Sequence, residues 1–218
     1  MKKLAFTIIE LVFVIIILGI LASLAIGRMD RDLKQEASET ILSHIRLTQQ
    51  LALSDNKHLP NSSLNWQRAY WRIQFKNCTK IKPIYNIGSD LDLSGGSDIS
   101  KKESAIDPIN GKYLYATCLS NSIASDVSED IFIGQKFGVT NVKLKGCSTI
   151  SGSTANQIAF DYLGRPHRGV AGYDSLSNFD RIVRSDCNLT VTLSDSTTFS
   201  IIIESETGHA YIENQREL

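Results

Sequence analysis

The strongest constraint in this chain is an apolar run near its start, which extends from Phe6 to Ile26 and contains one ionisable residue, Glu10. A helix that rises about 1.5 Å per residue would carry this run over roughly 31 Å, which matches a hydrocarbon core about 30 Å thick. The run therefore predicts a helix that spans a membrane. An unpaired charge inside such a span costs about 2.5 kcal/mol or more, so we expect Glu10 to have a partner.

Two ordinary explanations account for only part of this run. A cleaved secretory signal has an apolar region of about 7 to 15 residues followed by a small-residue cleavage site. This run is longer, and its small residue, Ala5, comes before it. A plain transmembrane anchor explains the length and places Lys2 and Lys3 in the cytoplasm, but it does not explain Glu10.

The residues Ala5-Phe6-Thr7-Ile8-Ile9-Glu10-Leu11, which follow a short basic segment, resemble the processing signal of type IV pilins and type II secretion pseudopilins. The resemblance implies that a prepilin peptidase cuts between Ala5 and Phe6 and methylates the new amino group of Phe6. Members usually have glycine where this chain has Ala5. The resemblance also implies a single-span protein of the bacterial inner membrane, with its N-terminus cytoplasmic and its head periplasmic, which later joins a pilus or pseudopilus. Its partners would be other pilin or pseudopilin subunits, the peptidase and an inner-membrane assembly platform.

The same resemblance gives Glu10 a partner. In a filament its carboxylate would pair with the positive N-terminal amine of a neighbouring subunit, so that the two buried charges compensate each other and set the axial register. The alternative is a Glu10 side chain that reaches back to the cytoplasmic membrane surface and has no role in assembly.

The rest of the chain predicts an α+β fold in which a long helix packs on an antiparallel β-sheet head. Residues 28–55 are amphipathic, because apolar or small side chains recur every three or four residues, as on one face of a helix. These side chains are Leu33, Ala37, Ile41, Ile45, Thr48 and Ala52. We therefore expect a cleaved leader over residues 1–5, a transmembrane and filament-core helix over 6–27, its amphipathic continuation over 28–55, and a periplasmic β-rich head over 56–218.

Short apolar or alternating segments between turn residues predict the strands of the head. They are Trp71–Phe75, Ile81–Ile87, Tyr113–Leu119, Ile131–Ile133, Val142–Lys145, Gln157–Tyr162, Arg181–Val183, Leu189–Leu193 and Thr198–Glu204. Pro83 would confine the second of these to a sheet edge, and the four residues between the last two predict a hairpin. Residues 88–111, with many Ser, Asp and Gly, predict a long exposed loop.

Four widely spaced cysteines are consistent with an exported head. They are Cys78, Cys118, Cys147 and Cys187, and they form no C-x-x-C pair, which disfavours zinc or thiol-redox chemistry. In an oxidising compartment an even number predicts two disulfides. Three pairings are open, and we favour the sequential one, Cys78 with Cys118 and Cys147 with Cys187; four reduced thiols are the alternative. Each sequential pair would close a loop of about 40 residues, worth roughly 4 kcal/mol in the chain-entropy model.

Two C-terminal segments carry a second resemblance. The stretches IAFDYLGRP at residues 158–166 and FSIIIESETG at residues 199–208 are similar to the C-terminal sheet of H-class minor pseudopilins (GspH) and FimT-like minor pilins. The shared pattern is an apolar strand with Phe160 and Gly164, followed by a last apolar strand that ends in Gly208. The resemblance implies a minor subunit.

The sequence contains no enzyme motif: G-x-S-x-G, the P-loop, H-E-x-x-H and G-x-G-x-x-G are all missing. The segment Asp90-Leu91-Asp92-Leu93-Ser94-Gly95 opens like a calcium loop. Its twelfth position, however, is Lys101, where a bidentate Glu is required. We therefore expect a polar turn there, no metal, no cofactor and no catalytic activity.

DNA capture is the alternative function. FimT-like minor pilins that bind DNA resemble one another in a C-terminal Gly-Arg-x-Arg turn, where this chain has Gly208-His209-Ala210-Tyr211. The cations that could replace that turn on phosphates are Arg165, Arg168, Arg181 and Arg184. Over the whole chain, however, 23 basic residues balance 23 acidic ones, so no basic excess indicates a nucleic-acid partner. The sequence therefore predicts a structural, non-enzymatic subunit for assembly of a type II secretion pseudopilus or type IV pilus, with DNA uptake in natural transformation as the alternative.

Overall fold

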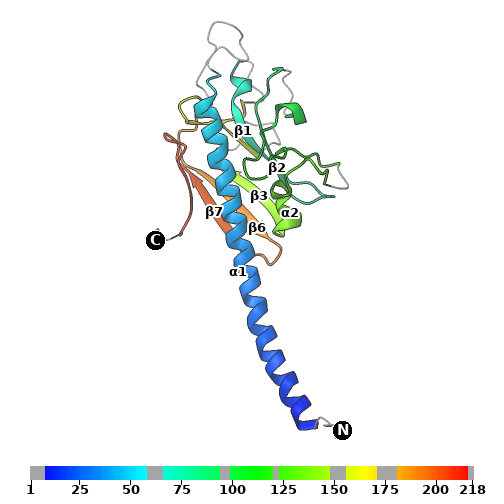
Figure 1. Cartoon of the computed structure of the whole chain (residues 1–218). Coiled ribbons are helices and arrows are strands. Elements are labelled where there is room, and N and C mark those ends of the chain that lie inside the picture. The colour runs from blue at the N-terminus through cyan, green and yellow to red at the C-terminus, as the bar shows by residue number, and fades with distance from the viewer. Residues whose placement is uncertain are drawn as a thin grey trace.

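The computed structural model describes residues 8–57, 66–93, 99–119, 123–147, 156–170 and 181–215, except for the side chains of residues 23–32. A long N-terminal helix carries a β-rich head on its C-terminal half, and its other half projects away from the head (Figure 1). The architecture is α+β, as the sequence predicted. The predicted leader, with Ala5, and Phe6 after it lie outside the described residues.

Helix α1 extends over Ile8–Ser54, and its end lies where the sequence changes from helical periodicity to polar turn residues. The side chains of the predicted apolar stripe that are fully or nearly fully buried are Ala37, Ile41, Ile45, Thr48 and Ala52. Leu33, at the start of the stripe, is 37 % exposed. Because four residues turn a helix by slightly more than 360°, these positions lie on one side of α1 and face the head together.

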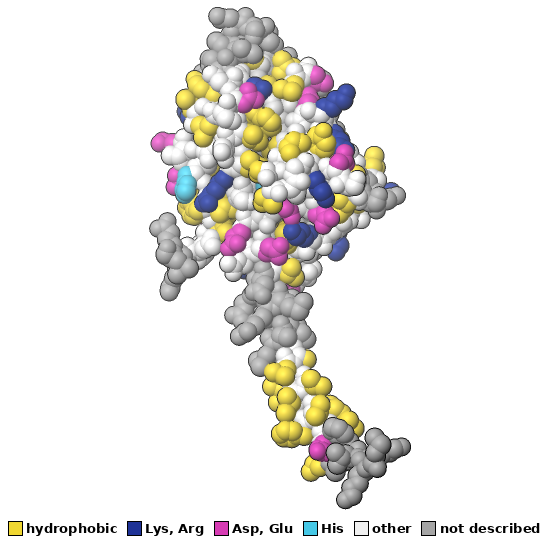
Figure 2. All heavy atoms as spheres, viewed as in Figure 1, with side chains coloured by type: hydrophobic (Ala, Val, Ile, Leu, Met, Phe, Trp, Pro, Cys, Tyr) yellow, Lys and Arg dark blue, Asp and Glu magenta, His cyan; other side chains and the backbone are white. Residues whose placement is uncertain are grey.

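The N-terminal part of α1 has an exposed apolar surface. Every residue from 8 to 22 is exposed, and Figure 2 shows a nearly continuous apolar surface on this part of the helix. In the part of the chain that the structure describes, no helix is both long enough and apolar enough to cross a membrane. Residues 6 and 7 of the predicted span and the side chains of residues 23–27 lie outside what is described.

The head contains two four-stranded antiparallel sheets. The first has the order β2-β1-β4-β5 and the second has the order β3-β6-β7-β8. The strands of the first sheet are β1 (Trp71–Lys76), β2 (Ile84–Gly88), β4 (Asn156–Phe160) and β5 (Pro166–Arg168). Those of the second are β3 (Val139–Lys145), β6 (Cys187–Leu193), β7 (Thr198–Ile203) and β8 (Ala210–Ile212). Short helical segments connect them: η1 (Trp66–Ala69), η2 (Lys101–Glu103), η3 (Glu129–Ile131) and α2 (Ile133–Lys136).

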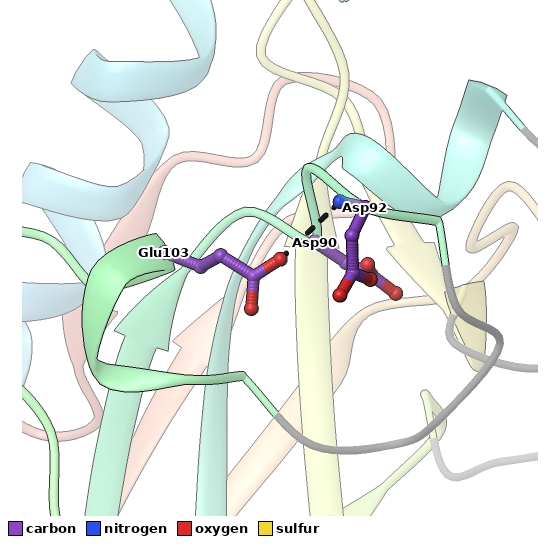
Figure 3. A group of neighbouring side chains, drawn as sticks. All are labelled: Asp90, Asp92 and Glu103. Carbon is purple, nitrogen blue, oxygen red and sulfur yellow. Dashed lines mark hydrogen bonds between the residues drawn. The ribbon is translucent and has the colours of Figure 1, made fainter.

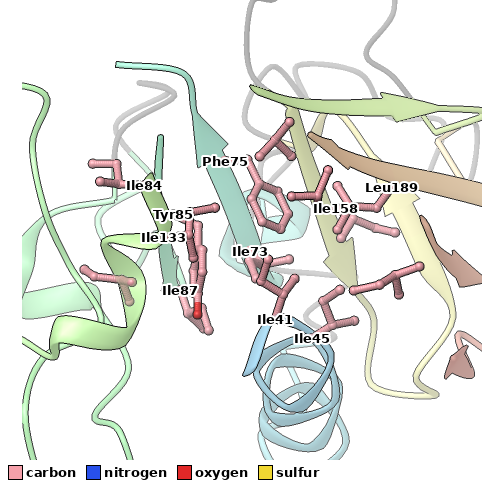
Figure 4. Packing of buried hydrophobic residues seen from close by; sticks show 14 of the residues in the cluster. Ile41, Ile45, Ile73, Phe75, Ile84, Tyr85, Ile87, Ile133, Ile158 and Leu189 are labelled. Atoms are coloured by element: carbon pink, nitrogen blue, oxygen red, sulfur yellow. The ribbon is translucent and has the colours of Figure 1, made fainter. Parts of the chain in front are cut away.

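The core lies where α1 meets both sheets. Ile41 and Ile45 on α1 face Ile73 on β1 and Ile158 on β4, with Leu189 on β6 nearby (Figure 4). All five are fully buried. Burial of one such side chain contributes about 1.5 to 3 kcal/mol, so this contact holds the helix firmly on the head.

Most predicted strands are present. The strand expected at a sheet edge because of Pro83 begins one residue later, at Ile84, and this strand, β2, is the edge strand of the first sheet. The predicted hairpin joins β6 and β7. The sequence missed β5 and β8, which have three residues each and lie at sheet edges. Segments this short offer no apolar alternation to detect.

Three predicted strands are wrong, for local reasons. Ile131–Ile133 lies at the junction of η3 and α2, because the Ser128 side chain accepts the N–H of Asp130 and caps a helical turn. Tyr113–Leu119 follows the outer edge of β2 with single contacts, such as the Ile87 N–H donating to the Leu114 carbonyl at 3.0 Å. Arg181–Val183 is not a strand, but among the described residues it lies beside β5, with an isolated bridge from Ile182 to His167 and a hydrogen bond from the Val183 N–H to the Pro166 carbonyl oxygen at 2.9 Å.

Both disulfides have the sequential pairing favoured above. Cys78 pairs with Cys118 and Cys147 pairs with Cys187, with Cα–Cα distances of 5.3 and 5.2 Å. The first joins the segment after β1 to the segment beside β2, and the second joins the end of β3 to the start of β6. Each therefore fastens two segments that lie side by side in the head.

Two glycines allow the turns of the head to approach α1 closely. The Gln49 side-chain amide on α1 donates to the carbonyl oxygens of Gly164 at 3.0 Å and Thr207 at 2.8 Å. Gly208 has φ +69°, and a Cβ built on it would lie 2.2 Å from the Gly164 oxygen. The β4–β5 turn, the β7–β8 turn and α1 thus meet at one point that has no room for a side chain.

The variant Gly208→Ala tests this close approach. The left-handed backbone conformation alone costs alanine about 1 to 2 kcal/mol, and the clash should add about 1 to 3 kcal/mol. Gly111→Ala is a matched control, because Gly111 has φ +70° but no atom within 4 Å of its built Cβ. Urea unfolding of the full chain in detergent should show a larger loss for Gly208→Ala, and equal losses would contradict the packing described.

Candidate functional site

The described residues that the sequence predicted to act in assembly or DNA binding lie in the N-terminal part of α1 and at the β5 edge of the first sheet. The loop after β2, where the sequence predicted a polar turn without a metal, is a third place of interest. Glu10 lies on α1 among exposed apolar residues, and its own side chain is exposed. Lipid or another subunit that covered this apolar surface would therefore also bury the carboxylate, which would then require a cationic partner. Ala5 and Phe6, the predicted cleavage and methylation positions, lie outside the described residues.

At the β5 edge, Arg165 is held by a buried carboxylate. The Arg165 Nε and Nη2 atoms each lie 2.8 Å from Asp161 Oδ2. The Asp161 side chain is fully buried, whereas that of Arg165 is 32 % exposed. The Asp161 carboxylate therefore neutralises much of the Arg165 charge, which makes Arg165 a weaker ligand for a phosphate.

The other predicted DNA contacts lie close to Arg165 in the fold. The Arg168 N–H donates to the Arg181 carbonyl oxygen at 2.9 Å, so the segment that begins at Arg181 lies beside β5. The Arg181 guanidinium donates to the Gly169 carbonyl oxygen. Among these four described arginines, Arg184 alone is exposed. The structure thus brings the arginines to one edge, but two of them serve internal contacts.

Asp161 organises this edge. Its Oδ1 accepts the backbone N–H groups of Leu163 at 3.0 Å and Arg165 at 2.9 Å, and its Oδ2 lies 3.2 Å from His167 Nε2. Burial by itself would raise the pKa of Asp161, but the hydrogen bonds from His167 and Arg165 outweigh it and hold this pKa below its ordinary value. Tyr70 packs edge-on against the His167 ring, with the centroids 4.9 Å apart. Asp161 is therefore a buried, ionised residue that shapes the β4–β5 turn.

A second acidic group lies in the loop after β2. One carboxylate oxygen from each of Asp90, Asp92 and Glu103 lies within 4.8 Å of the others (Figure 3). Asp90 is 1 % exposed, and the Nη2 atom of buried Arg72 is 3.9 Å from its Oδ2. Burial raises the pKa of Asp90, while Arg72 acts in the opposite direction. Three oxygen donors that converge in this way are the ligand type preferred by calcium and magnesium.

The sequence interpretation missed Glu103, because the calcium-loop pattern tested Lys101 at its twelfth position. Instead, Glu103 returns to the loop through η2: its Oε1 accepts the backbone N–H of Leu91 at 2.9 Å, and its Oε2 accepts that of Ser100 at 2.9 Å. The sequence Ser100-Lys101-Lys102-Glu103 has the S-x-x-E spacing of a capping box. That spacing predicts the contact between Glu103 and Ser100, whereas the contact between Glu103 and Leu91 depends on the fold.

Comparisons of this chain with protein-family models, with curated proteins and with solved structures gave no match.

The variant Asp161→Asn tests whether this residue is an ionised organiser of the β5 edge. The amide places an NH₂ group where Arg165 and His167 donate, so we expect a loss of about 2 to 4 kcal/mol in the free energy of unfolding near neutral pH. The pKa of Asp161 in the folded protein is below its ordinary value, which is about 3.9. Its contribution is therefore present above that value and is lost as the pH falls through the folded-state pKa.

Urea unfolding of both proteins as a function of pH measures this effect. The difference in free energy between the native chain and Asp161→Asn should be constant from neutral pH to about pH 5 and should shrink toward pH 3. Glu206→Gln, at an exposed carboxylate, is the control and should change stability by less than about 0.5 kcal/mol. A difference that does not depend on pH would exclude an ionised Asp161 as its source.

Proposed function

We propose that this chain is a minor pilin or pseudopilin, a non-enzymatic structural subunit for assembly of a type II secretion pseudopilus or type IV pilus. The observation that carries the proposal is the division of α1. Its C-terminal half is part of the head core, while the described side chains of its N-terminal half form an exposed apolar surface. A large apolar surface of this kind marks a site that lipid or another protein covers.

The membrane and then the filament would cover the apolar surface of α1. In the proposed cycle, residues 6–27 are stored in the inner membrane, with the N-terminus cytoplasmic and the head periplasmic. A prepilin peptidase removes residues 1–5 and methylates Phe6. The assembly platform then transfers the helix from lipid to the packed core of a filament, where neighbouring subunits replace the acyl chains.

The position of Glu10 supports this cycle. It lies on the exposed part of α1 that lipid or neighbouring helices would cover. Because the new amino group at Phe6 is positive, a Glu10 carboxylate on one subunit and the amine on the next can neutralise each other as both leave water. The pair would specify the axial position of each incoming subunit.

The head is consistent with export and with the H-class resemblance. Its two disulfides are typical of proteins that fold in an oxidising compartment. The two resembling segments contain Gly164 and Gly208, which meet each other and α1 at Gln49. This shared pattern therefore has a structural reason, since it fastens the helix to the last strands of the head.

The variant Glu10→Ala tests the proposed assembly role. An unpaired buried charge costs about 3 to 5 kcal/mol, so incorporation of the subunit into filaments should fall at least about tenfold, while the amount in the membrane fraction is unchanged. Glu39→Ala removes an exposed carboxylate from the half of α1 that carries the head and should leave both quantities unchanged. Normal incorporation of Glu10→Ala would contradict the ion-pair role.

DNA uptake is the second candidate, supported by the arginines that share the β5 edge. Deletion of the gene in the native host separates the two candidates when protein secretion, surface piliation and transformation are scored in one strain. We expect loss of secretion or piliation. Loss of transformation alone would favour DNA capture, and the exposed Arg184 would then be the first residue to replace.

A further inference from the structure

We propose that Asp90, Asp92 and Glu103 form a calcium-binding site at the end of β2. Their converging oxygens, within 4.8 Å of one another, fit a single ion, because two ligands at 2.3 to 2.6 Å from calcium can be up to about 5 Å apart. The site lies on the head and does not depend on the proposed assembly role.

The state of Asp90 is the independent observation that points to a ligand. Its side chain is 1 % exposed, and neither carboxylate oxygen accepts a hydrogen bond. Its nearest cationic atom, Arg72 Nη2, is 3.9 Å away, at the outer limit of an ion pair. Burial of an ionised carboxylate without hydrogen bonds is costly, and a divalent cation among the three carboxylates would remove that cost.

The other buried carboxylates show that this fold satisfies such groups when they are purely structural. Asp161 accepts hydrogen bonds on both oxygens, and so does Asp107, from the Ile109 N–H and the Ser128 hydroxyl. Asp90 differs from both, because neither of its oxygens accepts a hydrogen bond, and one of them lies within 4.8 Å of a carboxylate oxygen from each of Asp92 and Glu103 (Figure 3). Its surroundings are therefore those of a ligand rather than of a turn-forming residue.

The backbone holds the three carboxylates together without an ion. The Ser89 N–H donates to the Glu103 carbonyl oxygen at 3.1 Å, and Glu103 Oε1 accepts the Leu91 N–H. Gly88 permits this approach, because a Cβ there would lie 2.6 Å from the Glu103 carbonyl oxygen. Glu103 Oε1 also accepts the Asp92 N–H, and its Oε2 accepts both the N–H and the hydroxyl of Ser100. To bind calcium, Glu103 would have to give up one of these hydrogen bonds, such as that from the Ser100 hydroxyl.

The net local charge is negative, by one unit. Three carboxylates lie near two arginines: Arg72, beside Asp90, and Arg68, whose guanidinium donates to the Leu93 carbonyl oxygen at 3.3 Å. Lys101, nearby in sequence, pairs instead with Asp126 at 2.5 Å. Asp92 is exposed, so water can reach the ion and complete the six to eight oxygen ligands that calcium takes.

Titration calorimetry with calcium chloride tests the proposal on the full chain in detergent, after treatment with a chelator. We expect one site with a Kd of about 10⁻⁵ to 10⁻³ M, the range of calcium sensors and extracellular modules. Magnesium should bind at least about tenfold more weakly, since it requires regular octahedral geometry and loses water reluctantly. No binding of calcium at millimolar concentration, or equal binding of magnesium, would overturn the assignment.

Two variants locate the site. Asp92→Asn removes an exposed ligand, so it should fold normally and bind calcium at least about tenfold more weakly; Asp195→Asn, an exposed residue of the β6–β7 hairpin, should bind like the native chain. Calcium should also raise the Tm of the native chain, since it binds only the folded state, and Asp90→Asn should abolish this increase. In chelator Asp90→Asn should have a lower Tm than the native chain, because the buried Arg72 loses its counter-charge, so the readout is the change in Tm on addition of calcium. Native affinity in Asp92→Asn would overturn the site.

Discussion

The burial of the α1 stripe in the head is the interaction on which the rest of the structure depends. Ile41 and Ile45 fill the space between the helix and strands of both sheets. Polar contacts then fix the helix along its axis, since the Arg46 Nη2 atom donates to the Ala210 carbonyl oxygen at 2.9 Å, and Gln49 holds two turns. The exposed apolar N-terminal part belongs to the same continuous helix, which extends over Ile8–Ser54.

Two buried carboxylates of the head, Asp161 and Asp90, differ in how their charge is compensated. Around Asp161 the turn supplies backbone and side-chain donors for both oxygens, so the carboxylate costs little to bury and gives the β5 edge its shape. Around Asp90 the nearest groups are two more carboxylates and an arginine at 3.9 Å. The chain itself supplies the partners of Asp161, whereas in our proposal a calcium ion binds Asp90. In the proposed filament, the Glu10 carboxylate would pair with the N-terminal amine of a neighbouring subunit.

The parts of the fold that follow from periodic burial could be predicted from the sequence. The stripe from Ala37 to Ala52, the β6–β7 hairpin and the strands with clear apolar patterns are where the sequence placed them. The elements that it missed or placed wrongly depend on tertiary or side-chain contacts. β8 has only three residues and relies on β7, while the Ser128 side chain caps a helical turn where Ile131–Ile133 suggested a strand. Cysteine spacing alone leaves three disulfide pairings open, so the sequential pairing could be favoured but the choice depended on the fold.

The candidate sites show the same limit. The sequence grouped Arg165 with Arg168 because they are close in the chain. It could not show that Arg165 donates to Asp161 or that Arg181 donates to the Gly169 carbonyl oxygen. The sequence pattern identified Asp90 and Asp92 but missed Glu103. Glu103 is more than ten residues away along the chain, and it reaches the other two because its backbone packs against Gly88. Groups of side chains that are close along the chain could therefore be predicted from the sequence, whereas groups brought together by tertiary contacts could not.

The central claim is that α1 is processed, stored in a membrane and then covered by neighbouring subunits. The most direct measurement is mass spectrometry of the N-terminal peptide of the protein purified from membranes and from sheared filaments of its native host. The account predicts a chain that begins at Phe6 with a methylated amino group in both fractions. A chain that keeps Met1, or one cut after the apolar run, would contradict it.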